Sequence, residues 1–150
     1  MIDVSVDMGD IREKLSKLKA GIESDRVLNG VATIAVDGIQ GGGGIFDDEG
    51  IQGGPMGSIL WEQSKAARTE NRKTLHKSGH LRRSVHRTNA AGGEVKVGTT
   101  AVYGAIHQFG GFAGKDKKTE LPARPFIGIN RETQKRIADY LEEYLAKSMR

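Results

Sequence analysis

The sequence predicts an α+β protein in which an antiparallel β-sheet packs against N- and C-terminal α-helices, with a long glycine-rich loop. Apolar residues recur at helical spacing near both ends of the chain, over residues 11–35 and 137–145. Segments 2–7, 84–89 and 94–99 have the composition and alternation of strands. A chain of 150 residues can bury one core, so a single domain over residues 1–150 is expected.

The first forty residues are expected to run from a strand into helix. Apolar and polar side chains alternate over residues 2–7, which is the period of a half-buried strand. Asp10 and Glu13 have the spacing of a capping box, so a helix should follow. Gly21 leaves open whether this region is one loosened helix or two. The two apolar stripes are Ile11, Leu15, Leu18 and Ile22, then Val27, Val31, Ile34 and Ala35.

Residues 38–58 differ in kind, because nine of the 21 are glycine. Glycine loses the most backbone entropy on ordering, so this segment is expected to be a mobile loop that orders against a neighbouring molecule. A phosphate-binding loop is excluded, since no Gly-Lys-Ser/Thr sequence follows the glycines. The acidic run 47–49 is expected to be a solvated tip.

Beyond the loop, short elements alternate. Trp61 is expected to anchor the loop to the core. Residues 78–84 predict a short helix or turn that leads into a β-hairpin over 85–99, followed by a short helix that ends at Gly110. Pro122 and Pro125 favour an extended segment. Asn130 is placed to cap the last helix, whose apolar stripe is Ile137, Leu141, Tyr144 and Leu145.

Charge is unevenly distributed along the chain. Residues 1–62 have a net charge of −6, residues 63–90 of +7 and residues 91–150 of +3. The basic middle segment could bind the phosphate backbone of a nucleic acid, or it could pair with the acidic segment of a neighbouring subunit. Arg82 and Arg83 are the candidate interface residues, and reversing both to Glu is expected to impair assembly and leave the fold intact.

Several chemistries are excluded or disfavoured by the residue inventory. There is no Cys, which excludes disulfides and thiolate chemistry. His76, His80 and His86 lack the spacing and the accompanying carboxylate of a metal site. His107 has no acid or nucleophile near it in sequence, so a buried, hydrogen-bonded structural role is preferred over a hydrolase. We therefore expect no catalytic residue, no metal and no cofactor.

The acidic N-terminus lacks the layout of a signal peptide. The longest apolar run, residues 31–36, is too short to span a bilayer, so no membrane partner is expected.

Five motifs follow one another along the chain: a Trp after a loop, a basic stretch, a Ser-Gly-His-Leu-Arg-Arg-Ser turn, the run YGAIHQFG and the run ARPF. In this order they resemble the phage virion morphogenesis (tail-completion) family of Mu-like and related myophages. The resemblance covers roughly residues 60–149. It departs at Gly104, where the family usually has Ala, and in the unusual glycine content of residues 38–58. The matching residues are Trp61, Gly79, Leu81, Tyr103, His107, Phe109, Gly110, Arg124, Pro125 and Phe126.

The resemblance implies a structural protein that forms a ring, hexameric in this expectation, at the head–tail junction and completes the tail or neck. Its partners would be further copies of itself and tail-tube or head-connector proteins, with transient contact to phage DNA also open. It would reside in the host bacterial cytoplasm during assembly and then in the virion tail or neck. The matching residues are expected to be fold determinants: Phe109 should pack with Phe126, and Arg124 should satisfy carbonyls or a carboxylate. The alternative is a basic nucleic-acid-binding module.

Overall fold

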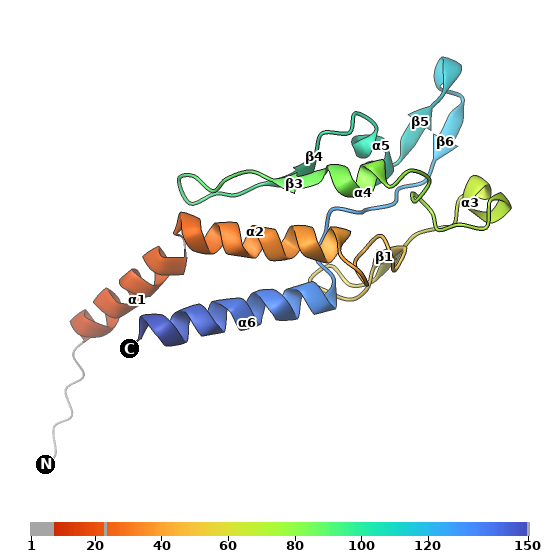
Figure 1. Ribbon diagram of the computed structural model, residues 1–150. Helices are drawn as coiled ribbons and strands as arrows, with labels where there is room; N and C mark the ends of the chain where they lie inside the picture. Colours follow the sequence, from red (N-terminus) through yellow and green to blue (C-terminus); the bar gives the residue numbers. More distant parts are fainter. Residues whose placement is uncertain (1–7, 23, 150) are drawn as a thin grey trace, which may run out of the picture.

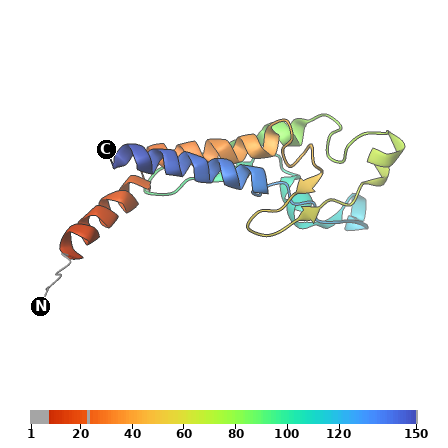
Figure 2. The same ribbon diagram turned by 90° about the horizontal axis from the view of Figure 1, so that it is seen from below.

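The computed structural model describes residues 8–22 and 24–149 and confirms an α+β architecture (Figure 1). Two long helices lie side by side, and short strands and helices gather along one side and at one end of that pair (Figures 1 and 2). The helices are α1 (Met8–Ile22), α2 (Asp25–Gln40), α3 (Lys65–Thr69), α4 (His80–Ser84), α5 (Gly104–Phe109) and α6 (Arg131–Ser148). The strands are β1 (Gly50–Ile51), β2 (Ile59–Leu60), β3 (Val85–Arg87), β4 (Val97–Thr99), β5 (Gly111–Ala113) and β6 (Thr119–Leu121).

The strands form three separate antiparallel pairs, β1–β2, β3–β4 and β5–β6, where a single sheet was expected. The predicted hairpin over 85–99 is present, with Val85 opposite Thr99. It continues past the strands through a hydrogen bond from the Thr88 N–H to the Lys96 carbonyl at 2.8 Å. The predicted strand over residues 2–7 lies outside the described residues.

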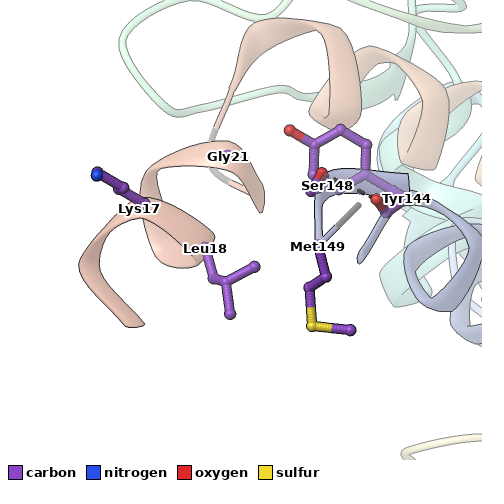
Figure 3. Close-up of a pocket in the computed structure, with 6 residues that line it drawn as sticks. All are labelled: Lys17, Leu18, Gly21, Tyr144, Ser148 and Met149. Atoms are coloured by element: carbon purple, nitrogen blue, oxygen red, sulfur yellow. Dashed lines mark hydrogen bonds between the residues drawn. The ribbon is translucent and has the colours of Figure 1, made fainter. Parts of the chain in front are cut away.

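The helix ends follow local sequence rules. Ser24 caps α2, so the two N-terminal stripes belong to two helices that separate at this cap, after Gly21. Asn130 caps α6 as predicted, its Oδ1 accepting the Thr133 N–H at 2.8 Å. The predicted stripe on α6 is half-buried. Helix α1 leaves the body at an angle, and a hollow of about 480 Å³ separates it from the C-terminal end of α6 (Figure 3).

Helices α2 and α6 approach closely because α2 carries glycine where they meet. A Cβ atom at Gly30 would collide with the Tyr140 hydroxyl, and one at Gly38 would collide with the Thr133 side chain. Gly38 was expected in the mobile loop, yet it lies inside α2 and is buried. Helix propensity disfavours glycine there, so the packing of the two helices overrides the local signal.

The core takes much of its apolar surface from the glycine-rich segment. Phe46 is fully buried, with its ring centroid 5.5 Å from that of Trp61 and 5.7 Å from that of Phe126. The structure thus differs from the expected loop, because the glycines allow tight turns that return apolar side chains to the core. Gly50, at φ +149°, lies directly against the β2 backbone. The core cluster comprises Ile39, Ile45, Phe46, Ile51, Trp61, Leu81, Val85 and Phe126.

Gly38→Ala tests the close contact between α2 and α6. The added methyl group must push Thr133 and its helix away, which we expect to lower the free energy of unfolding by about 1–3 kcal/mol. Gly42→Ala is the matched control, because nothing lies within 4 Å of a Cβ there. Urea unfolding followed by circular dichroism measures both. Equal stability of the two variants would contradict the packing described here.

Candidate functional site

The residues of the sequence signature converge on the extended segment that leads into α6. The Trp61 indole Nε1 donates to the Pro125 carbonyl at 2.8 Å. The Arg124 N–H donates to the His107 carbonyl at 2.6 Å. Trp61 therefore anchors the chain as expected, by a hydrogen bond as well as by packing.

Gln108 completes this arrangement. Its Oε1 accepts the N–H groups of Phe126 and Ile127, each at 3.0 Å, and its Nε2 donates to the Ile127 carbonyl at 3.2 Å. One amide side chain thus takes the place of a neighbouring strand for these backbone groups. Sequence reasoning did not select Gln108. The sequence did contain a signal for it. Gln108 lies on a predicted short helix shortly before a proline-containing extended segment, whose backbone groups need hydrogen-bond partners.

The signature glycines and Leu81 support the backbone. Gly79 precedes α4 with φ +65°, and Gly110 ends α5 with φ +74°. A side chain at Gly110 would also press on the Ala123 backbone, so this position needs both conformational freedom and space. Leu81 is buried in the core cluster.

Phe109 does not pack with Phe126, so that expectation is wrong. Phe126 is fully buried, whereas Phe109 is 78% exposed. Because α5 ends at Phe109 and turns its His107–Gln108 side toward segment 124–127, the last side chain faces solvent. Val102 is 96% exposed and Phe112 is 61% exposed, so the stretch 102–112 presents three large apolar side chains to solvent.

A basic cleft of about 280 Å³ lies beside these residues, and we define it by Arg72, Lys77, Tyr103, His107 and Arg124, which line it. Arg124 is only 5% exposed, and its Nε donates to the Glu62 carbonyl at 2.9 Å, which confirms that it satisfies a carbonyl. Burial lowers the pKa of Arg124, and the negative charge of Glu62, which raises it, only partly offsets this effect. Burial, followed by the charge of Arg124, lowers the pKa of His107.

The two aromatic groups at the cleft differ in how they are held. The Tyr103 hydroxyl lies 2.7 Å from His80 Nδ1 and forms a hydrogen bond with it. His107 was expected to be hydrogen-bonded, but its buried Nδ1 has no partner among the described residues. Within the same part of the chain, no group of three His, Asp or Glu side chains could hold a metal ion.

Arg82, expected at a subunit interface, joins two segments of its own chain. Its Nη1 donates to Asp47 Oδ1 at 3.0 Å, and its Nη2 donates to the Gly41 carbonyl at 3.0 Å. Gln40 lies alongside and donates from Nε2 to the Val85 carbonyl at 2.6 Å. The expectation that Arg82 can be reversed without harm to the fold is therefore corrected, because the change would oppose Asp47 with a second carboxylate.

Asp47 and Glu49 are likewise not a solvated tip, since Glu49 Oε1 accepts the Thr74 N–H at 2.6 Å. Burial opposes ionisation of Asp47, but hydrogen bonds from Arg82 and the Gly43 N–H, with the charges of Arg82 and Lys73, outweigh it and lower the pKa of the carboxyl. Arg83 is exposed and bonds only locally, to the Ser78 carbonyl at 3.0 Å.

Comparison with known proteins gives one family and two curated relatives. Residues 49–146 match the phage virion morphogenesis family. "Mu-like prophage FluMu G protein 2" of Haemophilus influenzae is 43% identical over 51 residues, which cover 34% of this chain and 37% of that protein. "Putative capsid assembly protein G" of Escherichia phage Mu is 28% identical over 93 residues, which cover 61% of this chain and 58% of that protein. The chain thus matches less than two thirds of either relative. No solved structure matches it significantly.

Gln108→Ala tests the amide contact with the extended segment. The change leaves the N–H groups of Phe126 and Ile127 without acceptors, and we expect a loss of about 2–4 kcal/mol in the free energy of unfolding. Gln134→Ala, on the exposed side of α6, is the control and should be nearly neutral. A Gln108→Ala protein as stable as that control would show that the contact contributes nothing.

Arg82→Glu and Arg83→Glu separate the internal contact from surface charge. We expect Arg82→Glu to cost roughly 1.5–3 kcal/mol and Arg83→Glu to be nearly neutral. Asp47→Asn adds a pH test: the lowered pKa of Asp47 stabilises the fold above its unfolded value of about 3.9, and this contribution is lost as pH falls through the folded pKa. The stability difference between wild type and Asp47→Asn should therefore shrink from pH 7 to pH 3 in urea unfolding. A constant difference would refute the assignment.

Proposed function

The chain belongs to the phage virion morphogenesis family, and from this premise we propose that it completes the phage tail or neck by forming a ring at the head–tail junction. The membership supports a structural role in virion morphogenesis. The ring, its place in the virion and its hexameric state are the finer parts of the proposal.

The observation that carries the proposal is that the buried signature residues have structural roles. Trp61, Arg124 and Phe126 are buried and hold segment 124–127 in place through hydrogen bonds and packing. Residues held in this way set the shape of a subunit, as an assembly protein requires. We therefore propose no catalytic activity for the chain.

The relatives' names are consistent with a role in virion assembly, since one is called a putative capsid assembly protein and the other belongs to a Mu-like prophage. On this basis we propose tail-tube or head-connector proteins as partners, host cytoplasm as the site of assembly, and the tail or neck as the final location. No described helix has the length and apolar composition needed to cross a membrane.

The shape of the subunit supports head-to-tail association. Helix α1 projects at one end of the α2–α6 pair, whereas α3, α5 and the β5–β6 pair lie toward the other end (Figures 1 and 2). Two different ends can meet repeatedly between copies, and such a heterologous contact closes into a ring when the rotation permits. The exposed apolar side chains of Val102, Phe109 and Phe112 supply surface for such a contact.

The structure weighs against the alternative of a nucleic-acid-binding module. Within the basic segment 63–90, Arg72 pairs with Glu70, Arg82 pairs with Asp47, and Arg87 bonds to Asn29 and Thr33. Lys73 Nζ donates to the Asp47 carbonyl. Arg83 bonds to the Ser78 carbonyl, so five of the segment's eight basic side chains have partners within the chain. The charge available for phosphate contacts is therefore smaller than the sequence indicates.

Phe109→Asp tests the proposed ring. Burying this side chain between subunits would make it an anchor, so we expect its replacement to weaken association by about 30-fold or more and to leave the unfolding transition unchanged. Met56→Asp is the matched control, because Met56 is 69% exposed and lies outside the signature. Sedimentation velocity over a concentration series, without DNA, measures association. Wild-type protein that stays monomeric throughout would contradict the proposal.

A further inference from the structure

We propose that the basic cleft binds carboxylates, and that its occupant is the acidic N-terminal segment, residues 1–10, of a neighbouring copy. This inference rests on the proposed ring, and it names the contact that would join successive subunits.

The first support is a buried cation with donors to spare. Arg124 is 5% exposed, and its Nε bonds to the Glu62 carbonyl. Its two terminal nitrogens have no hydrogen-bond partner among the described residues, and Arg124 lines the cleft. A guanidinium presents a planar fork that matches a carboxylate, so the spare donors suit an anion of that shape.

The second support is the composition of the lining. Arg72, Lys77 and His107 line the cleft together with Arg124, and no Asp or Glu is among the described lining residues. Arg72 is already paired with Glu70, which lies outside the lining, so Lys77 and Arg124 supply the other positive charges of the cleft. His107 Nδ1 is buried without a partner in the described part of the chain. A small hollow with Lys77 and Arg124 on its walls is more favourable for an anion than for water alone.

Protein is favoured over DNA as the source of the anion because the stretch that supplies Tyr103 and His107 to the cleft also exposes large apolar side chains. Tyr103 lines the cleft, and its sequence neighbour Val102 is 96% exposed. Phe109, two residues from His107, is 78% exposed. A phosphate backbone gains nothing from such surface, whereas a peptide that carries both carboxylates and apolar side chains can contact both the cations of the cleft and the exposed apolar residues.

Residues 1–10 of this chain have that composition. Asp3, Asp7 and Asp10 supply carboxylates, and the segment contains no Lys or Arg. Its apolar residues include Ile2, Val4 and Val6. This segment leads into α1, which projects at the opposite end of the molecule from α3 and α5 (Figures 1 and 2). Residues 8–10 belong to α1, so a copy whose α1 end meets the α3–α5 end of the next copy would bring residues 1–10 toward that cleft. Leu18 and Met149 face the hollow between α1 and α6 (Figure 3), and α1 meets α6 where Gly21 lies against Tyr144.

The first experiment measures binding of a fluorescent peptide of sequence MIDVSVDMGD to the full-length protein by anisotropy. We expect binding, and we expect the cleft variant Arg72→Gln/Lys77→Gln to weaken it by about tenfold. Arg83→Gln removes an exposed cation outside the cleft and is the matched control. Equal binding by all three proteins would overturn the proposal. So would displacement of the peptide by an equimolar 20-base-pair DNA, because the cleft would then prefer phosphate.

The second experiment uses the full-length variant Asp3→Asn/Asp7→Asn, which removes two carboxylates and keeps side-chain size. Sedimentation velocity should show subunit association weakened by about tenfold relative to wild type. If wild type and variant assemble equally, the ring stands and the inference fails. If wild type does not assemble at all, the proposed function fails, and the peptide measurement still decides whether the cleft binds carboxylates.

Discussion

The fold depends on satisfying the backbone of two largely irregular segments. Segment 41–51 carries Phe46 into the core, and segment 122–129 carries Phe126 there, yet most of their N–H and C=O groups lack strand partners. Buried backbone groups without partners are costly. Tight turns satisfy many of the N–H groups of the first segment, and side chains supply further hydrogen bonds to both segments. The Arg82 guanidinium does this for the first segment, and the Gln108 amide and the Trp61 indole do it for the second. The core exists because these polar contacts hold its two aromatic side chains in position.

Local signals in the sequence predicted the elements that depend on local physics. Asn130 as a helix cap, the 85–99 hairpin and the end of α5 at Gly110 follow from capping, alternation and glycine geometry, and all three are present. The errors concern contacts between distant residues. Gly38 is needed in α2 because a larger side chain would collide with Thr133. Arg82 forms an ion pair with Asp47, which is 35 residues away in the sequence.

The candidate site shows the same division. The resemblance selected residues that matter, but a single sequence could not tell which face inward. Arg124 and Phe109 belong to the same signature, yet one is 5% exposed and the other 78% exposed. The buried members fix the fold, and the exposed apolar residues are available for contacts between molecules. A structural protein of a virion needs this separation, since its subunit must stay unchanged while its surface joins neighbours.

The central claim is that copies of this chain associate head to tail and close into a ring without nucleic acid. Native mass spectrometry of the purified, DNA-free protein at low ionic strength tests it most directly. We expect one dominant oligomer with a fixed copy number, six in this proposal, that loses intensity as salt is added. A spectrum of monomer alone, or an open-ended series of oligomers without a preferred copy number, would contradict the claim.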